Sequence, residues 1–282
     1  MSDTNIPTAQ KIVRKCLAVI SSINPKWAVN AGLQIFSTPL SRRKKNHYLP
    51  DDMVKEEVVL KGKRVHLYRY GQSSKKILLV HGWEGAASDF SQFFKPLKEQ
   101  NFEIWTLDLP GHGESAFSQL NVLIASDLLI ELNDLKGPFL ALVGHSFGGF
   151  SLGLASTKRA ELSNLPLITI GAPTRLHRIL EEYAKFVDFN DDQLDYMFNK
   201  IERDFKIKIN DFEQGKFLKN HKAPILIVHD KQDEMVPYSR LEDIKEQTTA
   251  PEFHITDGLG HTRILRNRKV VDKIVSFISD HL

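Results

Sequence analysis

Short runs of apolar residues alternate along the chain with longer segments in which apolar residues recur every three or four positions. The short runs predict buried strands, and the periodic segments predict helices that bury one face. The expected strands lie at residues 76–82 (where the strand runs into a loop), 103–107, 139–143, 166–170, 225–229 and 253–256. The expected helices lie at residues 88–100, 122–132, from 147 onward, 175–205, 238–247 and 268–281. Because such alternation is typical of a sheet with helices on both faces, we expect an α/β fold with a mostly parallel, doubly wound sheet.

A β-hairpin is expected ahead of this alternating region. Residues 56–61 and 64–70 are rich in strand-forming residues and flank a short turn. No internal repeat or low-complexity linker interrupts the chain. We therefore expect an N-terminal helical arm of residues 1–50 and one α/β domain of residues 51–282, which contains a helical insertion at residues 174–222.

The arm has a helical pattern from Thr8 to Phe36, broken near Asn24-Pro25. The preferred interpretation is a helical appendage packed on the main sheet. The alternatives are a helix that lies in a membrane interface and a dimer contact. The basic run from Arg42 to Lys45 slightly favours membrane contact, although solvated basic loops are commoner.

Composition restricts the function classes. The chain has 282 residues, of which 41% are hydrophobic and 26% charged, as in ordinary globular proteins. The formal net charge of +3 is too small to indicate a nucleic-acid partner. No apolar run approaches the roughly 18 residues needed to span a membrane, and the apolar stretch at residues 16–20 is too short for a signal peptide. One cysteine, Cys16, excludes an intramolecular disulfide, and we expect a cytoplasmic protein.

Polar residues follow the expected strands, at the sheet edge where ligands bind in parallel α/β folds. Residues 144–148 spell G-x-S-x-G between an expected strand and an expected helix, which puts Ser146 at a sharp turn. Glycine at both ends of this motif removes side chains that would collide in such a turn. Acidic residues at 230–234 and His261 follow later strands. A serine, an acid and a histidine therefore share one edge of the sheet, in that chain order.

Five local motifs carry a resemblance to a known family. They are H-G-W-E-G at residues 81–85, D-L-P-G-H-G-E-S at 108–115, G-H-S-F-G-G at 144–149, D-E-M-V-P at 233–237 and G-L-G-H at 258–261. Together they resemble the α/β-hydrolase family, whose nucleophile, acid and histidine occur in this order. The resemblance extends from about Glu56 to the C-terminus.

The resemblance implies a role for each of three distant residues. Ser146 is the expected nucleophile, His261 its base and Asp233 the acid that orients the histidine. Asp233 is preferred because it stands ahead of the Val-Pro pair as the family's acid does; Asp230 and Glu234 are the competing candidates.

The resemblance also implies an oxyanion hole made of the backbone N–H groups of Trp83 and Phe147. Their side chains are expected to bind substrate by lining the acyl pocket, although Trp83 could also be a packing aromatic. We expect a loop-fixing ion pair for Glu84 and structural ion pairs for Arg263 and Arg266, with recognition of an anionic substrate group as the alternative for the arginines.

His112, Ser115 and the helical insertion are not expected to take part in the chemical step. His112 and Ser115 are expected to form local hydrogen bonds rather than to react. Within the insertion, residues 190–193 resemble a capping box that opens a second helix. The resemblance implies that this short insertion is a lid, which favours substrates of modest size.

The preferred function is a serine hydrolase that cleaves carboxylic esters of short to medium chain length through an acyl-enzyme on Ser146. Its expected partner is a small-molecule ester; no metal or other cofactor is expected, and the oligomeric state is left open. The alternatives are a thioesterase, a cofactor-free acyltransferase or perhydrolase with the same three residues, and a non-catalytic receptor on this fold.

Overall fold

The chain divides into a unit that contains the sheet and a unit made of helices. The computed structural model describes residues 8–41 and 48–282. The described residues of Pro39–Thr174 and Glu213–Leu282 form one unit, which contains the sheet; residues 8–38 and Arg175–Phe212 form the other, which is helical. The arm therefore groups with residues 175–212 of the predicted insertion. The basic run at residues 42–45 lies outside the described residues.

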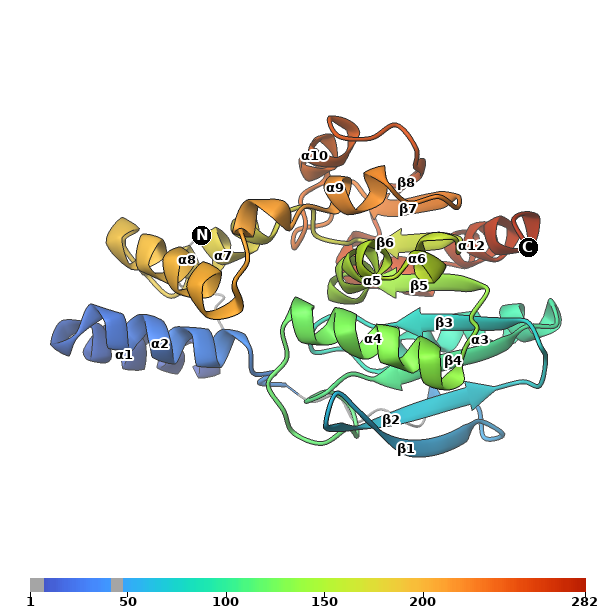
Figure 1. The fold of residues 1–282 in the computed structure, drawn as a ribbon, viewed down its shortest axis with the longest axis horizontal. Coiled ribbons are helices and arrows are strands. Elements are labelled where there is room, and N and C mark those ends of the chain that lie inside the picture. The colour runs from blue at the N-terminus through green and yellow to red at the C-terminus, as the bar shows by residue number, and fades with distance from the viewer. Residues whose placement is uncertain (1–7, 42–47) are drawn as a thin grey trace. The chain divides into compact units, whose positions relative to one another are not determined.

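The sheet unit contains eight strands in the order β1-β2-β4-β3-β5-β6-β7-β8 (Figure 1). The strands are β1 Val54–Leu60, β2 Lys63–Tyr70, β3 Lys76–Val80, β4 Glu103–Asp108, β5 Ala141–His145, β6 Leu167–Ile170, β7 Ile225–Asp230 and β8 Glu252–Thr256. The first two form an antiparallel hairpin, β2 pairs antiparallel with β4, and the pairs from β4 to β8 are parallel. The expected hairpin and the mostly parallel doubly wound sheet are confirmed.

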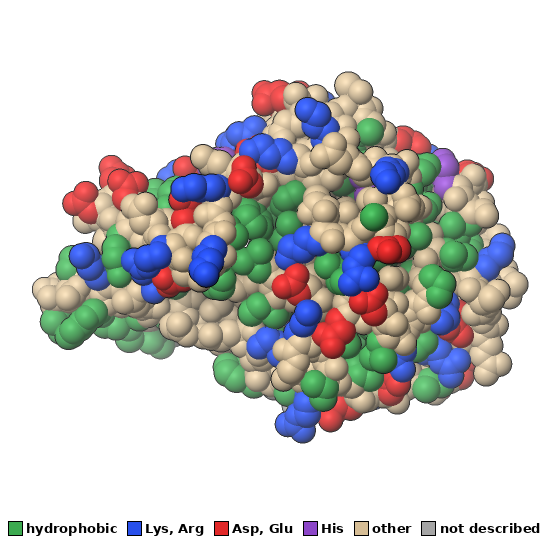
Figure 2. All heavy atoms as spheres, in the orientation of Figure 1, with side chains coloured by type: hydrophobic (Ala, Val, Ile, Leu, Met, Phe, Trp, Pro, Cys, Tyr) green, Lys and Arg blue, Asp and Glu red, His purple; other side chains and the backbone are tan. Residues whose placement is uncertain are grey.

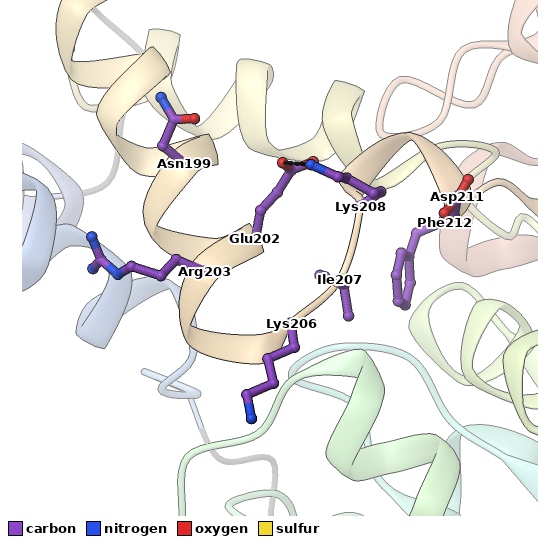
Figure 3. Close-up of a pocket in the computed structure, with 8 residues that line it drawn as sticks. All are labelled: Asn199, Glu202, Arg203, Lys206, Ile207, Lys208, Asp211 and Phe212. Atoms are coloured by element: carbon purple, nitrogen blue, oxygen red, sulfur yellow. Dashed lines mark hydrogen bonds and ion pairs between the residues drawn. The ribbon is translucent and has the colours of Figure 1, made fainter.

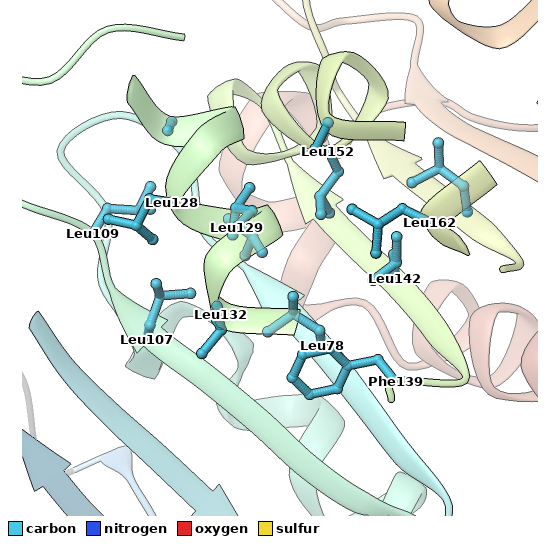
Figure 4. Packing of buried hydrophobic residues seen from close by; sticks show 14 of the residues in the cluster. Leu78, Leu107, Leu109, Leu128, Leu129, Leu132, Phe139, Leu142, Leu152 and Leu162 are labelled. Atoms are coloured by element: carbon cyan, nitrogen blue, oxygen red, sulfur yellow. The ribbon is translucent and has the colours of Figure 1, made fainter. Parts of the chain in front are cut away.

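Helices cover both faces of this sheet, because alternate strand residues point to opposite sides. The helices of the unit are α3 Ser91–Glu99, α4 Val122–Lys136, α5 Phe147–Lys158, α6 Ala160–Ser163, α9 Gln214–Lys219, α10 Glu242–Lys245, α11 Gly260–Arg263 and α12 Arg268–Asp280. Leu78 belongs to the core cluster that α4 and α5 cover (Figure 4). Its neighbours Ile77 and Leu79 belong to a second cluster, which α3 and α12 cover. The short helices α6, α9 and α11 were not predicted individually.

The helical unit contains α1 Thr8–Ile23, α2 Pro25–Phe36, α7 Leu176–Phe186 and α8 Asp191–Phe205. Asn24 caps α2 by accepting a hydrogen bond from the Lys26 N–H at 2.9 Å, and Pro25 suits the first helical position. Val29 of α2 packs with Leu180 of α7 and Met197 of α8 in the core of the unit. The break expected near Asn24-Pro25 is confirmed, as is the capping box at residues 190–193.

An open hollow of about 640 Å³ lies beside the end of α8 (Figure 3). It is lined by Asn199, Glu202, Arg203, Lys206, Ile207, Lys208, Asp211 and Phe212, all of the helical unit. Glu202 pairs with Lys208 at 3.2 Å and accepts the Ile209 N–H at 2.9 Å. These contacts close the turn after α8, so we assign the hollow a structural role.

Within residues 8–41 and 48–282, no helix is both long enough and apolar enough to cross a lipid bilayer.

Candidate active site

Ser146 occupies a strained turn between β5 and α5. Its φ of 50° and ψ of −120° lie in a region that L-residues rarely adopt, and its N–H donates to Ile170 O at 2.8 Å. Glycines make the turn feasible: a Cβ on Gly144 would lie 2.5 Å from the Gly149 Cα, and one on Gly148 would lie 2.3 Å from Val80 O. The backbone therefore holds the serine at the end of β5 at a conformational cost that the surrounding packing must offset.

Asp233 and His261 form a hydrogen-bonded pair. The His261 Nδ1 lies 2.8 Å from Asp233 Oδ2, and the Asp233 side chain is almost fully buried. Asp233 Oδ1 accepts the backbone N–H groups of Met235 and Val236 at 2.9 and 2.8 Å. Burial raises the pKa of Asp233, but the hydrogen bond from His261 and the backbone donors outweigh it and leave the pKa below its usual value. The carboxylate thus stays ionised, and a neutral His261 that donates from Nδ1 presents Nε2 as a base.

Asp230 holds the loop that carries His261. This fully buried carboxylate accepts hydrogen bonds from the Thr256 hydroxyl at 2.6 Å and from the N–H groups of Leu259 and Gly260 at 3.0 and 2.9 Å. Gln232 N–H donates a fourth at 2.9 Å. Burial raises the pKa of Asp230, but these donors lower it more, to about 2. Asp230, weighed from the sequence as a competing acid, binds the backbone just before His261 rather than its ring.

Two more side chains fix the same loop. His145 Nε2 lies 2.9 Å from the carbonyl oxygen of His261, and burial lowers the pKa of His145 to about 3, so this ring is a neutral donor. The Arg263 guanidinium donates to the carbonyl oxygens of Gly258 and Leu259, each at 2.9 Å. The expected ion pair of Arg263 is therefore wrong: its partners are backbone carbonyls.

Ser146, Asp233 and His261 follow the ends of β5, β7 and β8, which lie at one edge of the sheet. A Cβ on Gly171, directly after β6, would lie 3.3 Å from both Asp233 Oδ2 and His261 Nδ1. Ile170, one residue earlier, accepts the Ser146 N–H. Within the described residues no hydrogen bond joins the Ser146 hydroxyl to His261. Such contacts are often long without substrate and shorten in the complex.

The peptide between Gly82 and Trp83 is fixed beside the serine. Gly82 O lies 2.7 Å from His81 Nδ1 and 3.0 Å from the Gly85 N–H. Leu109 N–H donates to His81 Nε2 at 3.0 Å, and burial lowers the pKa of His81, so the neutral ring donates from Nδ1. In a trans peptide the N–H points away from the carbonyl, so the Trp83 N–H is directed away from the His81 ring.

Gly82 also brings that peptide close to the turn at Ser146. A Cβ on Gly82 would lie 2.9 Å from the Ser146 Cβ. The Trp83 ring packs edge-on against the Phe147 ring, with centroids 5.5 Å apart. Both residues of the predicted oxyanion hole are thus neighbours of the serine. The sequence analysis assigned no role to His81 or His145. His81 lies directly before Gly82, and His145 lies directly before Ser146.

The remaining predicted residues form structural contacts. The His112 ring lies 2.9 Å from Pro110 O, and the Ser115 hydroxyl donates to Asp108 O, which confirms local roles for both side chains. Glu84 accepts the N–H groups of Leu40 and Ser41 at 3.1 and 3.0 Å. Glu84 therefore fixes a loop as expected, but its partners among the described residues are backbone donors rather than a cation.

A sequence model of the alpha/beta hydrolase family matches residues 77–273, about seven tenths of the chain. The chain belongs to this family. The matched segment begins in β3, ends in α12 and includes Ser146, Asp233 and His261. A comparison with curated protein sequences finds no match.

Several solved structures share the fold of this α/β hydrolase. Carboxylesterase CesB (YbfK) from Bacillus subtilis is 16% identical, with a TM-score of 0.64 over 84% of this chain and 95% of that one. Est1E from Butyrivibrio proteoclasticus, solved with ferulic acid, is 19% identical, with a TM-score of 0.62 over 80% and 98%. The thioesterase domain from the curacin biosynthetic pathway is 15% identical, with a TM-score of 0.58 over 82% and 100%. At these identities the likeness extends to the fold alone.

We expect Asp230→Asn to destabilise this α/β hydrolase in a pH-dependent manner. The folded-state pKa of Asp230 is about 2, below the ordinary 3.8, so its stabilising contribution is full above pH 3.8 and is lost as the pH falls towards about 2. The difference in unfolding free energy between wild type and variant should therefore be largest near about pH 6 and shrink in that acidic window. Urea unfolding across the pH range measures it.

Asp257→Asn is the matched control, because Asp257 lies in the same loop but is 58% exposed. It should change the unfolding free energy much less near neutral pH. A pH-independent effect of Asp230→Asn would contradict the assigned role of the charge.

Proposed function

We propose that this α/β hydrolase is a serine hydrolase that cleaves carboxylic esters through an acyl-enzyme on Ser146. The observation that carries the proposal is the 2.8 Å hydrogen bond between Asp233 and His261, formed at the sheet edge beside the strained turn of Ser146. A serine hydroxyl is barely acidic and needs an adjacent base. The ionised Asp233 orients His261 and stabilises the imidazolium that forms when the base takes the proton.

The first half of the proposed reaction is acylation. Ser146 Oγ attacks the ester carbonyl carbon while its proton passes to His261 Nε2, giving a tetrahedral intermediate. His261 then returns the proton to the alcohol oxygen as the carbon–oxygen bond breaks, which leaves an acyl-serine. In the second half, water loses a proton to His261 and attacks the acyl-serine, and Ser146 leaves with that proton. Atoms and charge balance with water as the other reactant.

The oxyanion would be stabilised by the backbone N–H groups of Phe147 and Trp83. Phe147 is the first residue of α5, so its N–H has no acceptor within the helix and lies at the positive end of the helix dipole. The Trp83 N–H belongs to the peptide whose carbonyl is held by His81 and Gly85. The paired rings of Trp83 and Phe147 would bind the acyl group.

Carboxylic esters of short to medium chain length are the proposed substrates. This choice is supported by the family match and by the carboxylesterase and esterase among the structures that share the fold. Thioesters are the second candidate, since a thioesterase domain shares the fold and the same acyl-enzyme serves both leaving groups.

We expect an alkyl fluorophosphonate to label the wild-type protein at Ser146, because the probe reacts with serines activated by a base. Ser146→Ala should abolish labelling and hydrolysis of p-nitrophenyl esters, whereas Ser276→Ala, at an exposed serine, should leave both unchanged. Intact-mass and peptide mass spectrometry locate the adduct. Full labelling of Ser146→Ala would refute the proposed nucleophile.

Asp233→Asn should lower kcat by about 10³- to 10⁴-fold, since the amide no longer holds His261 in the tautomer that exposes Nε2. Asp230→Asn, which changes the loop but not the ring's partner, should lower kcat by about tenfold or less. Steady-state kinetics on a p-nitrophenyl ester compare the two. The reverse ranking would move the acid to Asp230.

His81→Leu should lower kcat by about tenfold to a hundredfold with little change in KM, because the freed Gly82–Trp83 peptide would weaken a contact to the transition state. His221→Gln, at a buried histidine bound to Leu165 O, is the control and should keep kcat. A His81→Leu protein with wild-type kcat would exclude His81 from orienting the oxyanion hole.

A further inference from the structure

Helix α1 carries an apolar stripe that its own unit does not bury. Ile12, Val19 and Ile23 are 56%, 63% and 70% exposed. With 3.6 residues per turn, these positions lie within about 40° of one another around the helix axis. Single exposed apolar residues are ordinary, but an aligned row of them is not. The row is therefore a surface of the helix and not a scatter of unrelated side chains.

The inner side of α1 is a separate apolar surface. Leu17, on the opposite side from the stripe, is 1% exposed, and Val13 and Ile20 are partly buried. One apolar face is enough to attach an amphipathic helix to its unit. The exposed stripe is thus a second apolar face that the internal packing does not require.

An exposed tryptophan follows the stripe. Trp27, in the first turn of α2, is 60% exposed and close in sequence to Ile23. Hydrophobic side chains gather along the lower edge of α1 and α2 in the space-filling view (Figure 2). Tryptophan is the residue type most suited to the boundary between water and lipid, since its ring is apolar and its N–H is polar.

The charge of this segment has one sign. Residues 8–36 contain Lys11, Arg14, Lys15 and Lys26 and no acidic residue. Arg14 pairs with Asp188, and Lys26 lies over the Tyr196 ring. Lys11 and Lys15 are exposed, and helical spacing puts them on one flank of the stripe.

We propose that this apolar row of Ile12, Val19 and Ile23, followed by the exposed Trp27 and flanked by Lys11 and Lys15, docks on the surface of an anionic phospholipid bilayer. The helices would lie in the plane of the interface, with the apolar row among the upper acyl chains and the lysines at the anionic headgroups.

Charge argues against a second copy of this chain as the occupant. A two-fold dimer would bring two copies of the same positively charged surface together, with no acidic residue of residues 8–36 to pair with Lys11 and Lys15. A bilayer rich in anionic lipid supplies both the apolar layer and the opposite charge. It is therefore the occupant that matches both properties of the face.

The one cysteine of the chain provides a local probe. Cys16 is exposed and helical spacing puts it beside the stripe. Full-length protein labelled there with an environment-sensitive NBD fluorophore would be mixed with vesicles of equal phosphatidylglycerol and phosphatidylcholine, or of phosphatidylcholine alone. Unlabelled protein would be tested in parallel by vesicle flotation. Both measurements are made at about 0.15 M salt and repeated at high salt, which screens surface charge.

We expect a blue shift of NBD emission and flotation with the anionic vesicles, and at least about tenfold weaker binding to phosphatidylcholine alone or at high salt. Ile23→Asp and the double variant Lys11→Glu/Lys15→Glu should each lower the partition coefficient by at least about tenfold. Val59→Asp is the matched control, because Val59 is also well exposed, at 60%, but lies on β1. Circular dichroism and hydrolysis of a water-soluble ester verify that each variant folds.

Three results would overturn the proposal. The first is that wild-type protein does not float with anionic vesicles, and the second is that the Ile23→Asp and Lys11→Glu/Lys15→Glu variants bind these vesicles as tightly as wild type. The third is that the wild type binds no vesicles but forms a dimer, which Ile23→Asp dissociates. The last result would assign the face to a second copy of the chain. Because Ser146→Ala protein should bind vesicles like wild type, failure of the proposed hydrolase chemistry and failure of membrane docking are separately observable.

Discussion

Two buried carboxylates at the end of β7 determine where the loop of His261 can lie. A buried carboxylate is stable only where donors replace its water. Asp230 finds its donors in Thr256, Leu259 and Gly260, so the loop after β8 must fold over it. Asp233, three residues on, then receives the His261 ring. One acid restrains the backbone and the other the side chain, and neither restraint alone would fix both the position and the tautomer of the imidazole.

Neutral histidines hold two backbone carbonyls of the proposed site. Burial lowers the pKa of both His81 and His145, and the two rings donate to the carbonyl oxygens of Gly82 and His261, respectively. The centroid of the His145 ring is 4.8 Å from that of His261. If His145 carried a charge, the imidazolium formed at His261 during acylation would face a second cation at short range. With a pKa of about 3, His145 stays neutral, and the Asp233 carboxylate balances the positive charge on His261.

The sequence predicted those parts of the fold that depend on local patterns. The strands, the hairpin and the helix break at Asn24 follow from spacing and from the conformational limits of proline. The resemblance favoured Asp233 over Asp230, but the contacts by which Asp230 holds the loop could not be predicted, because these donors lie 26 to 30 residues away in the chain. Glu84 was assigned the wrong partner for the same reason: its donors, at Leu40 and Ser41, are backbone groups that no charge pattern reveals.

The arm shows a further limit of periodicity. A helical pattern tells which residues share a face, but α1 has apolar residues on two faces, and the pattern does not tell which one the protein buries. The structure resolves this, because Leu17 is enclosed whereas Val19 and Ile23 are exposed. Full burial of a valine or isoleucine side chain is worth roughly 1.5–3 kcal/mol, so leaving an aligned row in water forgoes several kcal/mol. An environment that is apolar, and negatively charged at its boundary, would recover that free energy without any change in the packing of the helical unit.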